Sequence, residues 1–174
     1  QFKLFDPSLP LNVSLEAYNP LIPLDVDNSS IPVGIFNWTI RNTSSRPVQA
    51  SICLNMSNML KNLNYRENKP HHDAINICVE KNGMRGIIFK NKINPSHPDY
   101  GSMMCFIPDT FQTNIQTRWY RGNWWDNAHI WWNDFSDDGQ IKEITDSLIN
   151  EGRDSDVASL LVHFNLAPGE TKTI

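Results

Sequence analysis

Tryptophans and aspartates gather in one part of the chain, residues 119–138, where the sequence reads WYRGNWWDNAHIWWNDFSDD. Aromatic side chains offer flat apolar faces with a polar edge, on which the apolar faces of sugars stack. Neighbouring carboxylates bind sugar hydroxyls, so this composition is typical of a sugar subsite. The candidate substrate-binding residues are Trp119, Trp124, Trp125, Trp131, Trp132 and Asp134.

The same residues have a commoner structural use. Paired tryptophans usually fill a hydrophobic core or an interface with a partner domain. The run Asp137-Asp138-Gly139 is ordinary turn chemistry. The sequence therefore favours packing over ligand stacking and leaves both uses open.

No other stretch has the spacing of a catalytic or metal site. Residues 71–73, His-His-Asp, are adjacent, and adjacent residues rarely converge on one ion, so a solvated loop is favoured. Asp25, Asp27 and Asn28 lack the full spacing of a calcium-binding EF-hand loop. No serine lies in a G-x-S-x-G context. We expect no metal and no cofactor.

The three cysteines, Cys53, Cys78 and Cys105, each lie inside an apolar run. Their odd number and wide spacing match no zinc or disulfide framework. Free cysteine is among the most buried residue types, which favours structural thiols that face a core. A single disulfide between two of them remains an alternative.

Composition excludes several classes of function. The chain has 174 residues and a formal net charge of −4, and its 15 Lys and Arg residues are scattered, so we expect no nucleic-acid partner. No apolar run is long enough to cross a membrane, and no signal peptide is present. The cellular compartment stays open. The extended start without an initiating methionine suggests a fragment of a longer chain.

Alternating polar and apolar residues predict strands along most of the chain. We expect hairpins between 33–41 and 48–56, between 75–80 and 84–90 around Asn82-Gly83, and between 102–107 and 111–119. Further strands are expected over 11–18, 158–165 and 171–174.

Two segments interrupt this pattern. Three prolines in 16–36 predict a strand, an extended crossover, an acidic turn and another strand, with no helix. A short helix is expected around 128–133, closed by Gly139, and 141–150 is ambiguous between helix and strand. The expected fold is all-β: one domain over 1–174, an antiparallel two-sheet β-sandwich with one or two short helices in 124–150.

Three segments together carry a family resemblance. Residues 9–42 contain the runs VSLEA and DNSSIPV among spaced prolines, 130–139 read IWWNDFSDDG, and 166–174 read LAPGETKTI. In this order they resemble the amino-terminal domain of glycoside hydrolase family 116, which includes bile-acid β-glucosidase, a non-lysosomal glucosylceramidase. Residues 57–100 match only loosely.

The resemblance implies that two domains of the parent enzyme have different roles. In this family a β-sandwich domain precedes a helical barrel that carries the nucleophilic Glu and the acid/base Asp of a retaining β-glucosidase. Neither catalytic residue has a counterpart here, so we expect this segment alone not to be catalytic, although its parent is an enzyme. Its expected partners are the helical catalytic domain of the same parent chain and a β-glucoside or glycolipid substrate of that enzyme.

Two functions remain open at this stage. The first is a non-catalytic domain that supports the missing barrel and contributes to the rim of its active site. The alternative is a stand-alone carbohydrate-binding or adhesion module that uses the tryptophans as its platform. Unpaired sheet edges also favour a homodimer through exposed strands.

Overall fold

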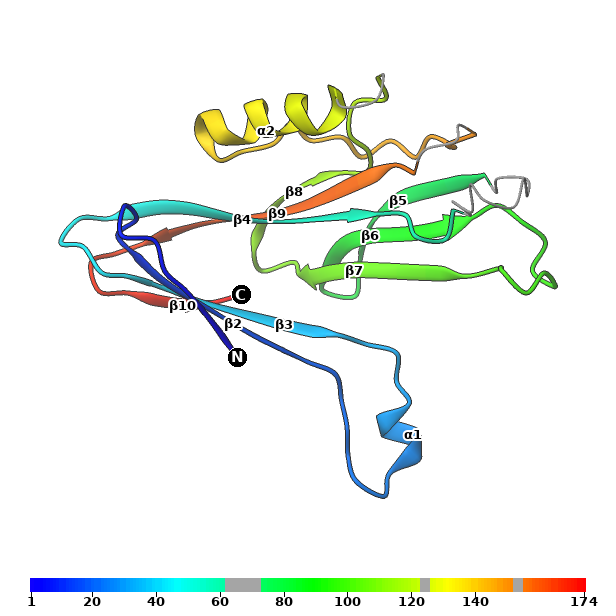
Figure 1. Ribbon diagram of the computed structural model, residues 1–174, viewed down its shortest axis with the longest axis horizontal. Coiled ribbons are helices and arrows are strands. Elements are labelled where there is room, and N and C mark those ends of the chain that lie inside the picture. The colour runs from blue at the N-terminus through cyan, green and yellow to red at the C-terminus, as the bar shows by residue number, and fades with distance from the viewer. Residues whose placement is uncertain (62–72, 123–125, 152–154) are drawn as a thin grey trace. The chain divides into compact units, whose positions relative to one another are not determined.

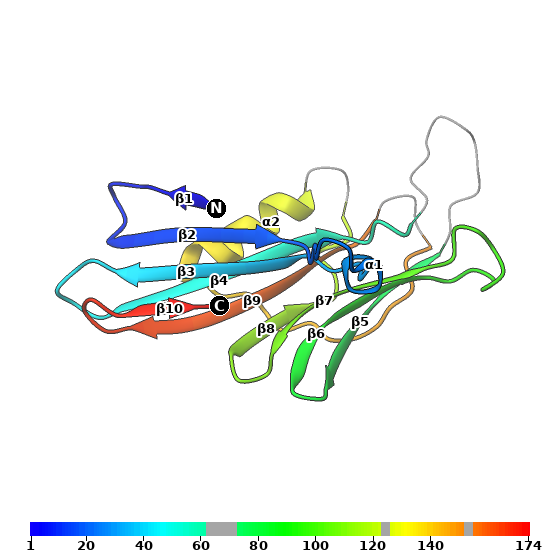
Figure 2. The ribbon, with the colours of Figure 1, turned by 90° about the horizontal axis from the view of Figure 1, so that it is seen from below.

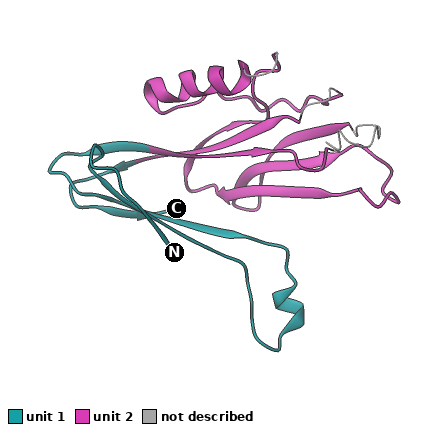
Figure 3. Ribbon diagram, in the orientation of Figure 1, with its two compact units in different colours: residues 1–50, 165–174 teal, residues 51–164 magenta. Residues whose placement is uncertain are grey.

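The computed structural model describes residues 1–61, 73–122, 126–151 and 155–174 (Figure 1). In these ranges the chain forms ten strands in three antiparallel sheets, together with two helices. Its contacts divide it into two compact units, unit 1 with residues 1–50 and 165–174 and unit 2 with residues 51–164 (Figure 3). The all-β prediction is confirmed, with three sheets in place of two, and the single-domain organisation stays a prediction.

The two helices differ in length and in whether the sequence predicted them. Helix α2 (Asp126–Asp138) falls in the segment where a helix was expected, and Gly139 follows it with φ of 72°. Helix α1 (Val26–Ser29) is a single turn in the segment expected to lack one, and that expectation is wrong. The prolines leave room for one turn, which the Asp25 carboxylate caps by accepting from Asn28 N. Among the described residues no helix is long and apolar enough to cross a membrane.

Unit 1 is built on one sheet with the strand order β1-β2-β3-β10. Figure 2 shows β1, β2 and β3 lying side by side. The strands span Phe2–Leu4 (β1), Leu11–Tyr18 (β2), Ile35–Asn42 (β3) and Thr171–Thr173 (β10). Because β2 and β10 occupy both edges of β3, the next strand in sequence cannot pair with it. The predicted hairpin between 33–41 and 48–56 is therefore wrong.

Asn42 holds two turns of unit 1 together. It is fully buried, and its amide nitrogen lies 2.7 Å from the carbonyl oxygen of Arg46, 3.2 Å from that of Leu166 and 3.1 Å from that of Ala167. Its amide oxygen accepts from Ser44 N at 2.9 Å. One side chain thus joins the turn after β3 to the turn before β10.

Two further sheets share a core in unit 2, and the first residues of β4 and the last residues of β9 belong to unit 1. One has the order β4-β9-β8 and the other β5-β6-β7. Buried Ile87 and Phe89 of the second sheet form one cluster with Ile115, Ala158 and Leu160 of the first. The strands span Val48–Ser57 (β4), Ala74–Lys81 (β5), Met84–Asn91 (β6), Ser102–Pro108 (β7), Gln112–Gln116 (β8) and Val157–Leu166 (β9).

The predicted turns of unit 2 have different outcomes. The hairpin between β5 and β6 is confirmed, and Asn82 and Gly83 adopt φ of 55° and 75° as its tight turn requires. The hairpin between 102–107 and 111–119 is wrong, because β7 pairs with β6 while β8 pairs with β9 in the other sheet. The ambiguous segment 141–150 forms only isolated bridges at Ile144 and Asn150.

Gly86 provides a test of strand packing in unit 2. A Cβ atom at this position would lie 2.2 Å from Cys105 O and 2.7 Å from Phe106 Cα, which are backbone atoms of the neighbouring strand β7. We expect Gly86→Ala to lower the free energy of unfolding by about 2–3 kcal/mol in urea titrations. The matched control is Gly101→Ala, whose Cβ would meet only the flexible Leu60 side chain at 3.3 Å. Equal losses in the two variants would contradict this account.

His163 on β9 makes the stability of unit 2 pH-dependent. Its ring nitrogens lie 3.1 Å from Ser51 Oγ and 2.8 Å from Asn114 Oδ1, and burial lowers its pKa below the ordinary 6.5. As pH falls below 6.5, the unfolded chain takes up this proton before the folded chain does, so stability should decrease. His163→Gln should flatten this part of the stability curve in urea titrations at a series of pH values, and an unchanged slope would contradict the role of His163.

Candidate functional site

The tryptophan segment forms an aromatic stack on unit 2. Trp131 of α2 lies on Trp119, which follows β8, with ring centroids 5.0 Å apart and planes 13° apart. Phe135, one helical turn further along α2, stacks on Trp131 at 5.1 Å. Trp131 is buried with Ile141 and Leu161 of β9. Its ring is therefore occupied by protein side chains, as the packing alternative expects.

The other candidate residues are placed differently. Trp132 is 58% exposed on α2, and Asp134 is exposed on the same helix. Trp119 is half-buried, and its indole nitrogen donates to Ser159 Oγ at 2.7 Å. Trp124 and Trp125 lie outside the described residues. The structure thus brings Trp119, Trp131 and Trp132 together, and the substrate-binding role of the six candidates stays a prediction.

A cavity of about 360 Å³ opens beside this stack. Its lining residues come from 119–122, which follow β8, from the start of α2, from 149–151, and from 155–157, where β9 begins. The lining residues used below are Trp119, Tyr120, Arg121, Asn127, Asn150 and Asp156. Two aromatic side chains and several amide groups thus meet in one hollow.

An ion pair forms part of the cavity wall. Arg121 Nε lies 2.9 Å from Asp156 Oδ1, and Arg121 Nη2 lies 2.6 Å from Asp156 Oδ2. The hydrogen bond to Asp156 raises the pKa of Arg121, and the guanidinium also donates to Leu148 O at 3.1 Å. Because the buried carboxylate neutralises the arginine, the cavity suits a neutral polar ligand better than an anion.

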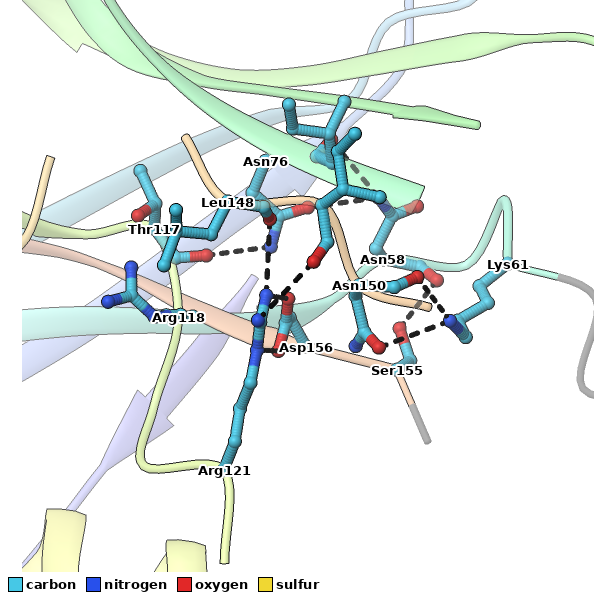
Figure 4. A network of polar contacts seen from close by, with 12 residues as sticks. Asn58, Lys61, Asn76, Thr117, Arg118, Arg121, Leu148, Asn150, Ser155 and Asp156 are labelled. Carbon is cyan, nitrogen blue, oxygen red and sulfur yellow. Dashed lines mark hydrogen bonds and ion pairs between the residues drawn. The ribbon is translucent and has the colours of Figure 1, made fainter. Parts of the chain in front are cut away.

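Behind the ion pair lies a buried polar network (Figure 4). Asn58 donates to Asn76 Oδ1 at 2.9 Å, and Asn76 donates to Thr117 O at 2.8 Å. Lys61, only 2% exposed, donates from its ammonium to Asn150 O at 2.7 Å and to Asn150 Oδ1 at 3.2 Å. These bonds fix the two segments that carry Arg121 and Asn150 to the sheets.

This network was not found from the sequence. Arg121 and Asp156 pair across a long sequence separation, and neither belongs to a recognisable motif. One signal was present: Asn76 interrupts the apolar run Ala74–Val79 at a position that shares a face with Ala74 and Cys78. A polar residue at an inward position of a strand requires buried hydrogen-bond partners.

The three cysteines are free thiols that pack against the core clusters. The disulfide alternative is therefore not adopted in this structure. Burial raises the pKa of Cys53 to about 12 and that of Cys105 to about 11, and it also raises the pKa of Cys78. Thiols in this state are poor nucleophiles and poor metal ligands at neutral pH.

The structure describes one of the two metal candidates, Asp25 with Asp27 and Asn28, at helix α1. Asp25 serves as the cap of α1 and binds Asn28 with both carboxylate oxygens. Residues 71 and 72 lie outside the described residues. Across the parts of the chain that the structure describes, no three His, Cys, Asp or Glu residues converge as a metal site would require.

Substitution of two neighbouring tryptophans of α2 tests which of them packs in the core and which lies on the surface. Trp131→Ala would open a cavity between α2 and β9, and we expect a loss of about 3–5 kcal/mol in the free energy of unfolding. Trp132→Ala removes an exposed ring and should cost less than about 1 kcal/mol. Urea denaturation followed by circular dichroism measures both, and a similar cost for the two variants would contradict the assignment of Trp131 to the core.

Comparison with known proteins agrees with the resemblance found in the sequence. Residues 1–174 match the family described as "beta-glucosidase 2, glycosyl-hydrolase family 116 N-term". A search of curated proteins gave no match. Since the family match spans the whole sequence, the chain belongs to the N-terminal domain family of glycosyl-hydrolase family 116.

Proposed function

We propose that residues 1–174 serve as a non-catalytic N-terminal domain of a β-glucosidase that acts on a β-glucoside or glycolipid. The domain supports the catalytic part of the same chain and contributes a surface to the rim of the active site. The observation that carries this proposal is the family match over the full sequence.

The state of the carboxyl groups supports a non-catalytic role. A retaining glycosidase needs two carboxyl groups about 5 Å apart, and its general acid needs a raised pKa. Hydrogen bonds from Ser8, Asn28 and Arg118 instead lower the pKa of Asp6, Asp25 and Asp146, respectively. The buried Asp156 is committed to Arg121. These carboxylates are arranged as hydrogen-bond acceptors for the fold.

The cavity beside the tryptophan stack supports the contribution to the rim. Tyr120 lines this cavity and is 57% exposed, and Trp132, elsewhere on α2, is 58% exposed. Exposed rings beside amide side chains can contact the outer sugar of a bound substrate while the chemistry takes place elsewhere.

The same cavity favours the alternative function, a stand-alone carbohydrate-binding module. Its volume suits one sugar ring, and Asn127 and Asn150 supply amides on its wall. The two functions differ in what the isolated chain does. A module binds a β-glucoside by itself in titration calorimetry, and Tyr120→Ala, which removes an exposed ring of the cavity, then abolishes the binding heat. A supporting domain releases no such heat in isolation.

A destabilising substitution in the full-length β-glucosidase tests the supporting role. Gly86→Ala should leave kcat/KM at 25 °C within about twofold, because it acts only through packing in unit 2. The temperature of half-inactivation should fall by at least about 2–4 °C, since the catalytic part loses its support. Gly101→Ala is the control and should change neither quantity.

Two results would overturn the proposal. The first is a Gly86→Ala enzyme whose N-terminal domain melts early while its activity survives to the original temperature. The second is a large loss of kcat at 25 °C with the domain still folded, because a purely supporting domain does not enter the chemical step.

A further inference from the structure

Unit 1 exposes an apolar loop between β2 and β3, residues 19–34. Leu24 at its tip is fully exposed, and Leu21 and Val26 are each 77% exposed. Ile22 and Ile31 are also exposed. Isolated apolar residues on a surface are normal, but five exposed apolar residues within one loop of sixteen residues indicate a contact site.

The loop is rigidly organised by its own hydrogen bonds. Ser29 Oγ accepts from Ile22 N at 2.9 Å and donates to Ile22 O at 3.0 Å, which closes the loop across its base. Asp25 N donates to Ile22 O at 3.0 Å, and the Asp25 carboxylate caps α1. The apolar tip is thus held in one shape before any partner arrives, which lowers the entropic cost of docking.

Leu24 carries backbone strain that its own tight turn imposes, because Asp25 N donates to Ile22 O and leaves Pro23 and Leu24 as the two central residues. Its φ is 69°, in the left-handed region where a residue with a Cβ is disfavoured. No packing in unit 1 repays this conformation, since the side chain is fully exposed. Strained residues of this kind cluster at functional and docking sites.

The charge of the chain around this loop indicates which kind of partner the loop can bind. From Leu4 to Ile40 the sequence has no Lys, Arg or His, but it has the carboxylates of Asp6, Glu16, Asp25 and Asp27. An anionic membrane surface would require basic residues beside the apolar tip. A two-fold contact between copies would bring like carboxylates of the two loops together. A protein pocket with an apolar floor and a Lys- or Arg-bearing rim complements the loop.

We propose that residues 19–34 are an anchor that inserts Leu24 and its apolar neighbours into such a pocket on the catalytic part of the same β-glucosidase chain. This inference rests on the proposed function, because the supporting role requires a docking element. Asp25 and Asp27 then face the basic rim, and the rigid loop fixes the docking geometry.

Thiol accessibility in the full-length β-glucosidase tests the anchor. Leu24→Cys should react with a maleimide at least about tenfold more slowly in the native protein than in the urea-unfolded protein, a ratio that corresponds to about 1.4 kcal/mol. Ser45→Cys is the matched control, because Ser45 lies in an exposed turn of the same unit. It should react at nearly its unfolded rate, and labelling is read by mass spectrometry at the peptide that carries residue 24 or 45, because the native cysteines also react in the unfolded protein.

The outcomes of the labelling experiment distinguish an anchor on the catalytic part from a contact with a second copy or with a membrane. Rapid labelling of Leu24→Cys overturns the inference, and if Gly86→Ala still lowers the inactivation temperature, the proposed function survives. Protection that disappears on dilution identifies a second copy as the partner and also overturns it. Protection that appears only with phosphatidylcholine or phosphatidylserine vesicles identifies a membrane surface, with the same consequence.

A charge at the tip provides an independent measurement. Leu24→Asp should leave the melting of the isolated chain 1–174 unchanged, because the side chain contacts nothing there. In the full-length enzyme it should lower the temperature of half-inactivation by about 2–4 °C, since a carboxylate is driven into an apolar pocket. Ser45→Asp should have no effect, and equal inactivation temperatures for wild type and Leu24→Asp would count against the anchor.

Discussion

The structure of unit 2 depends on the burial of β9 on both of its faces. Ala158 and Leu160 point into the core shared with β5, β6 and β7, whereas Leu161 packs under Trp131 of α2. A shift of one residue in register would exchange these two faces. Ser159, buried on the helix side, binds Trp119 Nε1 and Asn55 Oδ1, each at 2.7 Å, and so fixes the register further. The aromatic stack and the cavity therefore inherit their geometry from one strand.

The buried polar groups add specificity to this hydrophobic arrangement. Burial of the Asp156 carboxylate costs free energy that pairing with the more exposed Arg121 recovers only in part, and removal of Arg121 would leave this buried charge unpaired at a cost of several kcal/mol. Asn58 and Asn76 likewise donate to the carbonyl oxygens of Lys90 and Thr117. Such groups stabilise one arrangement of the connecting segments over its competitors, which keeps the cavity wall in place.

Local sequence patterns predicted most of the strands. The features that the sequence did not predict depend on pairings between residues far apart in the chain. Alternation identified β2 over Leu11–Tyr18, and Asn82-Gly83 identified the turn of the hairpin between β5 and β6 through positive φ. The partners of β3 could not be predicted, because β10 comes from the far end of the chain and takes the edge that a hairpin would use. For the site, clustering in sequence identified Trp131, but its burial depended on contacts with Leu161. No local pattern links Arg121 to Asp156.

The loop at residues 19–34 is ordered by its own hydrogen bonds although its apolar side chains are exposed. Its hydrogen bonds hold Leu24 in a conformation that costs about 1–3 kcal/mol, and the chain described here gives that side chain no burial in return. Burying a leucine contributes about 1.5–3 kcal/mol. Docking of Leu24 alone would therefore offset the strain, and burial of Leu21 and Val26 would leave a net gain. An element that is unfavourable in the isolated domain but favourable in a complex is what selection on a longer chain would produce.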